Sequence, residues 1–150
     1  FLGQDYSHLL IIKENIYKIP IVVRMPLFAY YITEPDLMSM IRDTFNPNSQ
    51  ERELEAYARL NRYPLLVIDD VGKIRARDGQ SAFTQQVYYR LIEYRYSWQK
   101  SIALASNLVG ADFEEYIGGS SYSRLVEMSS AGKYNITIKG KDFRLRNVNP

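Results

Sequence analysis

The chain has 150 residues, of which 46% are hydrophobic and 24% are charged, values typical of one globular domain with a core of ordinary size. It carries 19 Lys and Arg against 17 Asp and Glu, and the resulting net charge of +2 does not by itself indicate a nucleic-acid partner, which would require local clusters of basic residues. The absence of cysteine excludes disulfides and thiolate metal sites and is compatible with a cytoplasmic protein, and the apolar runs are too short to span a membrane.

The first part of the chain predicts a helix, a strand and a second helix. Thr33 or Glu34 is expected to cap the second helix, because Pro35 follows in a position that suits the first turn. The predicted elements are a helix over His8–Tyr17, a strand over Phe28–Ile32, and a helix from Thr33 or Glu34 that ends near Phe45–Pro47.

The rest of the chain continues this alternation of helices and strands. The helix after Phe45–Pro47 is expected to bury Leu54 and Ala58, with Leu60 as a further candidate for burial. The predicted elements are helices over Glu51–Asn61, Phe83–Tyr96, Asp112–Ile117 and Tyr122–Met128, and strands over Leu65–Ile68, Ser101–Ser106 and Tyr134–Ile138. The alternation predicts an α/β fold: a doubly wound, mostly parallel sheet with helices on both faces, forming one domain over residues 1–150 without a separate lid.

Two adjacent carboxylates, Asp69 and Asp70, follow the apolar run Leu65–Ile68. Such a run predicts a buried strand of a parallel sheet, and open α/β sheets bind ligands at the carboxyl ends of their strands. Neighbouring anions repel each other unless a cation or a proton-transfer role offsets the cost. This is the arrangement of a Walker B segment, in which the first Asp holds Mg²⁺ and the next acidic residue handles the attacking water. A solvated turn after a core strand is the alternative.

Two later residues add to this pattern. Asn107 ends the next apolar strand, where a neutral amide can orient a water molecule or a γ-phosphate, although an asparagine turn also explains it. Arg124 follows a Gly-Gly loop at the start of a short helix, from which a guanidinium is suited to reach a phosphate across a subunit boundary. An ordinary surface arginine is the alternative.

The order and spacing of these segments resemble the AAA+ ATPases, and within them the replicative-helicase loaders of the DnaC, DnaI and IstB type. The resemblance extends from about His8 onward. It is carried by Leu65–Gly72 as Walker B, Tyr94–Asn107 as the approach to sensor 1, Ser123–Leu125 as the box with the arginine finger, and Ile138–Arg144 as the Lys-Gly-x-Asp-x-Arg ending.

The resemblance implies an ATP-hydrolysing enzyme with Mg²⁺ as its cofactor and ADP as its product. Asp69 would ligate Mg²⁺ through water, Asp70 would act on the attacking water, and Asn107 would be sensor 1. Arg124 would act in trans on the nucleotide of a neighbouring subunit, and Arg144 would take part in nucleotide sensing or DNA contact, although an ordinary basic ending also explains it. Asp70 stands where glutamate is more usual, and its shorter reach would slow hydrolysis.

The phosphate-binding loop is the largest departure from the family. A P-loop needs Gly-x-x-x-x-Gly-Lys-Ser/Thr, which this chain lacks. Gly3 matches a loop glycine and Ser7 matches the hydroxyl that binds Mg²⁺, but Tyr6 replaces the lysine and Asp5 would repel phosphate. A degenerate loop, a chain fragment and an unreliable sequence at this end all remain open as explanations.

The same resemblance suggests partners. The expected partners are a replicative helicase, single-stranded DNA and further copies of the chain in an AAA+ oligomer. No membrane is expected among them. Lys73, Arg75 and Arg77 form a basic segment that could contact DNA phosphates, and a solvated loop is the alternative.

Three functions stay open on the sequence. They are a primosome component that loads a helicase in DNA replication, a non-catalytic interaction module with the same fold, and an IstB-like transposition helper. A response-regulator receiver fits less well, because its acidic pair should follow the first strand and a further strand-end Asp should come later.

Overall fold

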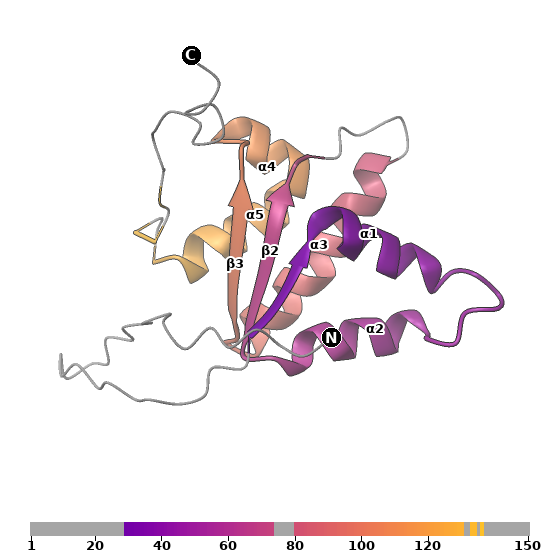
Figure 1. Ribbon diagram of the computed structural model, residues 1–150. Helices are drawn as coiled ribbons and strands as arrows, with labels where there is room; N and C mark the ends of the chain where they lie inside the picture. Colours follow the sequence, from indigo (N-terminus) through magenta and orange to yellow (C-terminus); the bar gives the residue numbers. More distant parts are fainter. Residues whose placement is uncertain (1–28, 74–79, 131–132, 135, 137–150) are drawn as a thin grey trace, which may run out of the picture.

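The computed structural model describes residues 29–73, 80–130, 133–134 and 136 (Figure 1). These residues form a three-stranded sheet and five helices. In chain order the elements are β1 (Ala29–Thr33), α1 (Glu34–Asp43), α2 (Glu53–Arg62), β2 (Leu65–Val71), α3 (Gln80–Ser97), β3 (Ser101–Ser106), α4 (Ala111–Ile117) and α5 (Gly119–Met128).

The sheet is parallel throughout, in the order β1-β2-β3, so the predicted α/β fold with a parallel sheet is confirmed for this part of the chain. Thr33 of β1 pairs with Asp69 of β2. On the other side Ile68 pairs with Leu104 and Val71 pairs with Ser106, so β2 carries one residue more than β3 between these pairs. This bulge contains the acidic pair, and an extra residue of this kind locally bends a strand.

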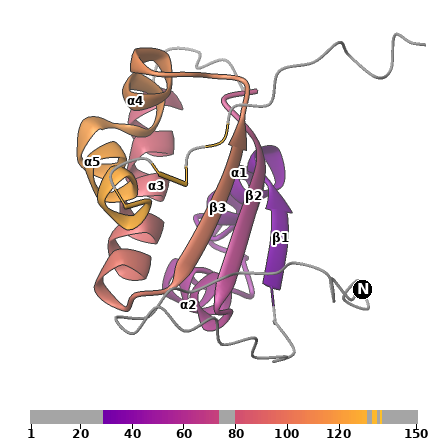
Figure 2. The ribbon, with the colours of Figure 1, turned by 90° about the vertical axis from the view of Figure 1, so that its left-hand side faces the viewer.

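All five described helices lie on one side of the sheet (Figure 2), whereas the sequence predicts helices on both faces. The reason is topological. The crossovers from β1 to β2 and from β2 to β3 step in the same direction, and right-handed crossovers that do so place their helices on the same face. Tyr31, Val67 and Ala103 are in register on the opposite face. The helix predicted over His8–Tyr17 lies outside the described residues.

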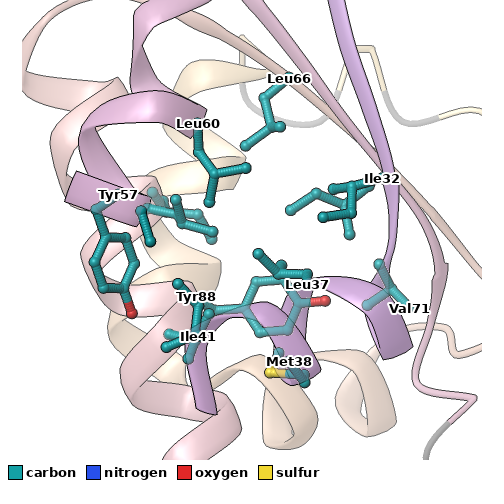
Figure 3. Close-up of a cluster of buried hydrophobic side chains, with 14 of the residues drawn as sticks. Ile32, Leu37, Met38, Ile41, Tyr57, Leu60, Leu66, Val71 and Tyr88 are labelled. Carbon is teal, nitrogen blue, oxygen red and sulfur yellow. The ribbon is translucent and has the colours of Figure 1, made fainter. Parts of the chain in front are cut away.

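The core lies between the sheet and α1, α2 and α3 (Figure 3). Full burial of a leucine or isoleucine side chain contributes about 1.5–3 kcal/mol, so this cluster is the main source of stability for the sheet–helix layer. The residues labelled in the figure are Ile32, Leu37, Met38, Ile41, Tyr57, Leu60, Leu66, Val71 and Tyr88.

The start of α1 follows the predicted capping. Thr33 is the N-cap, its hydroxyl oxygen accepts a hydrogen bond from the Asp36 N–H at 3.4 Å, and Pro35 lies in the first turn. The two short helices after β3 are also present, although α5 begins at Gly119 rather than at Tyr122.

Two predictions fail within the described residues. Leu54 is 80% exposed and Ala58 is exposed, because α2 turns Ala56 and Tyr57 toward the core instead, while Leu60 is buried as the sequence suggests. The strand predicted over Tyr134–Ile138 is not seen where the structure describes it, since Tyr134 lies in a turn and Ile136 has no regular structure. No helix of the described part is both long and apolar enough to cross a membrane.

Candidate functional site

The acidic pair lies at the carboxyl end of β2, the middle strand of the sheet (Figure 1). Thr33 ends β1 and Ser106 ends β3 at the same edge, since the strands are parallel and in register there. Asn107 comes one residue after Ser106, in an exposed bend. The structure therefore brings Asp69, Asp70 and Asn107 to one edge of the sheet, as the sequence predicts.

Both carboxylate oxygens of Asp69 accept hydrogen bonds. The Tyr31 hydroxyl donates to Oδ2 at 2.8 Å, and the Asp70 N–H donates to Oδ1 at 2.8 Å. The hydrogen bond from Tyr31, followed by that from the Asp70 amide, lowers the pKa of the Asp69 carboxyl below its ordinary value. Asp69 is therefore ionised at neutral pH, and a carboxylate with two donors still has lone pairs free for a cation or its water.

Asp70 adopts a backbone conformation that non-glycine residues rarely take, with φ of +58°. Asp and Asn tolerate this left-handed region better than other residues with a Cβ atom. The Asp70 carboxylate, which is 40% exposed, forms an ion pair with Lys73 Nζ at 2.8 Å. Backbone strain held in place by its surroundings is a feature of functional sites, and here it occurs at a residue that the sequence already marks.

The turn that follows is equally constrained. Gly72 has φ of +84°, and a Cβ atom added to it would lie 2.4 Å from Leu108 Cδ1. The Lys73 N–H donates to the Asp70 carbonyl at 3.1 Å, which closes the turn. We call residues 69–73 the acidic turn. Glycine suits the fourth position of this turn, because a side chain there would be strained by the positive φ and would have to displace the side chain of Leu108.

Sequence reasoning missed two residues that hold this edge. Tyr31 was read only as part of a strand, and Ser106 only as a strand end. The Ser106 hydroxyl donates to the Val71 carbonyl at 2.7 Å and accepts from the Leu108 N–H at 3.0 Å, so it fixes the path of the chain on either side of Asn107. Tyr31 lies two residues before the end of the neighbouring strand, β1. A hydroxyl at that position is the signal from which the partner of Asp69 could have been identified.

Arg124 lies apart from the acidic turn. Its Nε forms an ion pair with Glu93 on α3, and its guanidinium carbon lies 5.4 Å from the ring centre of Tyr89 and 5.9 Å from that of Tyr96. Because α3 begins after the acidic turn and ends just before β3 begins, Glu93 and Tyr96 lie toward the opposite end of the strands. Within one chain the structure does not bring Arg124 to the acidic pair.

Several predicted site residues lie outside the described residues, namely Gly3, Ser7, Arg75, Arg77 and Arg144. Of the basic segment only Lys73 is described, and it pairs with Asp70. Among the described residues no group of three or more His, Cys, Asp or Glu could hold a metal ion. A Mg²⁺ ion at Asp69 would therefore need further oxygen ligands, such as phosphate, water or a hydroxyl.

A surface hollow of about 310 Å³ lies elsewhere, between α1 and the segment that leads to α2. Asp36, Asp43 and Glu51 line it. Three carboxylates in one hollow repel phosphate, so this hollow does not suit a nucleotide, and the acidic turn remains the better candidate site.

Comparison with known proteins does not assign the chain to a family. No protein-family model matches it, and no curated protein matches it significantly. The likeness to helicase loaders therefore depends on the residues of the chain itself, and the activity is a proposal.

Proposed function

We propose that this chain is an ATP-binding and hydrolysing module of the AAA+ type that acts as a helicase loader in DNA replication, placing a replicative helicase on single-stranded DNA. One observation carries the proposal. Asp69 and Asp70 lie in the last three residues of β2, the middle strand of a parallel sheet, and Asn107 follows the neighbouring strand at the same edge. Ligands of open α/β sheets bind at this edge, and phosphoryl transfer needs these residue types there.

Asp69 has the properties that a Mg²⁺-binding residue needs. Its pKa is lowered, its carboxylate is held by two donors, and the described residues supply no complete metal cage around it. Mg²⁺ usually keeps several waters and takes only one or two protein carboxylates, with nucleotide phosphates as further ligands. When bound, Mg²⁺ would neutralise charge on the phosphates. Asp69 would hold the ion through one of its waters, and Ser7 would supply a hydroxyl.

Asp70 and Asn107 would act on the attacking water. The Asp70 carboxylate is bound to Lys73 and is partly open to solvent, so it would have to exchange this partner for a water molecule. Asn107 is exposed in the bend after β3, at the same edge of the sheet, and its amide would orient the same water or a phosphate oxygen without adding charge.

Arg124 would act in trans, on the nucleotide of a neighbouring copy. Its place on α5, away from the acidic turn of its own chain, is compatible with this role, which requires an oligomer. The guanidinium would first have to leave Glu93.

A non-catalytic interaction module is the second candidate. It is favoured by the two ion pairs Asp70–Lys73 and Arg124–Glu93, which satisfy the proposed catalytic groups inside the chain. The P-loop departures at Asp5 and Tyr6 point the same way. A transposition helper of the IstB type would use the same acidic turn and stays open beside the helicase loader.

The deciding experiment uses the full-length natural chain. We expect calorimetry to detect Mg-ADP binding, and Asp69→Asn to lower the rate of ATP hydrolysis at least about 100-fold while nucleotide binding is largely kept. Asp43→Asn, at the end of α1, is the matched control and should keep the wild-type rate. No heat of Mg-ADP binding, with helicase binding intact, would reject the ATPase in favour of the interaction module.

A further inference from the structure

Glu34 is a carboxylate with no solvent exposure, and it lies directly beneath the acidic turn. Three hydrogen-bond donors reach it. The Tyr88 hydroxyl donates to Oε1 at 2.6 Å, and the Gly72 N–H and the Tyr116 hydroxyl each donate to Oε2 at 2.9 Å. The donors come from α3, from the acidic turn and from α4, so one side chain at the start of α1 connects three other parts of the fold.

These contacts suit an ionised carboxylate. A buried charge is costly unless it is hydrogen-bonded, and here three donors converge on it at the N-terminus of α1, where the helix dipole favours an anion. Burial, together with the nearby Glu34 carboxylate, raises the pKa values of Tyr88 and Tyr116. Both hydroxyls therefore keep their protons at neutral pH and remain donors to Glu34.

The bond to Gly72 determines where the acidic turn lies. Gly72 is two residues after Asp70, and its φ of +84° and its closeness to Leu108 leave the turn little freedom. Glu34 holds the amide of Gly72 from the helical side, while the Ser106 hydroxyl holds the carbonyl of Val71. The direction in which Asp69 and Asp70 point follows from these two anchors, since both residues lie immediately before them.

We propose that Glu34 is the positioning residue of the acidic turn: it fixes Gly72, and thereby Asp69 and Asp70, in the arrangement that the site uses. The catalytic consequence of this role rests on the proposed ATPase function. Glu34 does not touch a ligand itself, because it is fully buried. The hydrogen bond from Tyr116 also connects Glu34 to α4, the helix that begins shortly after Asn107. Glu34 therefore contacts both the acidic turn and the helix that follows Asn107.

The first test measures the turn without nucleotide. In Glu34→Gln the side chain keeps its size, but its NH₂ group replaces one acceptor oxygen, so at least one of the three donors loses its partner. We expect the Gly72 amide to exchange hydrogen about tenfold faster or more, as followed by NMR, while the amide of Leu60 on α2 keeps its wild-type rate. An exchange rate at Gly72 that is unchanged both in Glu34→Gln and in the shorter Glu34→Asp would overturn the proposal.

Glu34→Asp provides a second variant in case Glu34→Gln does not fold. It keeps the charge at the start of α1 but is one methylene shorter, so its carboxylate no longer reaches Gly72 at hydrogen-bonding distance. Faster exchange at Gly72 is again the expected result, and wild-type exchange would count against the positioning role.

The second test separates positioning from general stability. We expect Glu34→Gln to lower kcat for ATP about tenfold or more, with KM for Mg-ATP within about twofold of wild type, because the turn rather than nucleotide binding is disturbed. Ile41→Val, in the same core, is the control, compared well below both melting temperatures. An equal loss of kcat in Ile41→Val would show that Glu34 acts through stability alone. If wild type does not hydrolyse ATP, the proposed function fails, and Gly72 exchange alone decides the role of Glu34.

Discussion

Asp69 is the residue on which the site depends, and its charge state is set by its neighbours. The Tyr31 hydroxyl and the Asp70 amide keep its pKa below the ordinary value. A depressed pKa means that this carboxylate stabilises the fold at pH values above its unfolded pKa, and that the stabilisation is lost as the pH falls through the folded pKa. The same hydrogen bonds keep Asp69 anionic and hold its carboxylate in one orientation, as binding of a cation requires.

A single substitution tests this explanation of the lowered Asp69 pKa. Tyr31→Phe removes the stronger of the two influences, so we expect the pKa of Asp69 to rise toward its ordinary value in an NMR titration of the carboxyl carbon. Tyr30→Phe is the matched control, because Tyr30 packs on the ring of Tyr63 at a centroid distance of 5.0 Å and does not bond Asp69. An unchanged Asp69 pKa in Tyr31→Phe would contradict this account of its ionisation.

At the scale of elements, Arg95 of α3 joins the parts of the fold that lie at the amino ends of the strands. Its guanidinium is fully buried and donates to the carbonyls of Tyr63, Pro64 and Ser101, each at 2.9 Å. Burial lowers the pKa of Arg95 to about 10, which still leaves it cationic at neutral pH. The end of α2, the start of β2 and the start of β3 are thus held by one side chain.

Removal of the Arg95 guanidinium should lower the free energy of unfolding. Arg95→Met removes the guanidinium donor from the carbonyls of Tyr63, Pro64 and Ser101, of which Pro64 keeps the Ser101 N–H at 3.1 Å, and we expect the free energy of unfolding in urea to fall by about 3 kcal/mol or more. Arg90→Met on the same helix removes a partly exposed ion pair with Glu53 and a contact with the ring of Tyr57 at 5.5 Å, and should cost less than about 1 kcal/mol. Equal losses for the two variants would show that the buried carbonyls do not depend on Arg95.

The prediction for α2 illustrates why a helical face is hard to choose from sequence. Leu54 and Ala58 are one helical turn apart and are predicted to face inward, yet both are exposed. Tyr57 faces the core instead, beside Leu60, which the sequence also offers as a candidate for burial. Two faces of α2 carry apolar residues at helical spacing. Only the contact of α2 with the rest of the core decides which face is buried.

For the whole molecule, the proposed mechanism requires more than one copy. Arg124 does not reach the acidic turn of its own chain, so the site would be completed by a neighbour. The face of the sheet that carries Tyr31, Val67 and Ala103 is also left uncovered by the described helices (Figure 2).

Sedimentation velocity tests this requirement. We expect Mg-ATP to raise the sedimentation coefficient of the full-length chain, and Arg124→Ala to reduce hydrolysis about 1,000-fold, the effect of a missing arginine finger. Arg62→Ala is the control, since Arg62 is exposed and stacks on Tyr63 at the other end of the sheet. Identical sedimentation with and without Mg-ATP would argue against a shared site.

The local features of this protein follow from short stretches of its sequence. The apolar run Leu65–Ile68 lies in a buried strand of a parallel sheet, Asp69 and Asp70 lie near the carboxyl end of that strand, and Thr33 with Pro35 begins α1. These predictions succeed because strand burial and helix capping depend on residues close together in the chain.

Which side chains contact one another across the fold depends on how the helices and strands pack. Glu34 reads as a cap residue, but it is buried against Tyr88 and Tyr116; Arg124 reads as a free guanidinium, but it pairs with Glu93. These partners are far apart in sequence, and no periodicity encodes which of them will be neighbours. Their identity follows from the packing of α1, α4 and α5 around α3, which is settled only when the core forms.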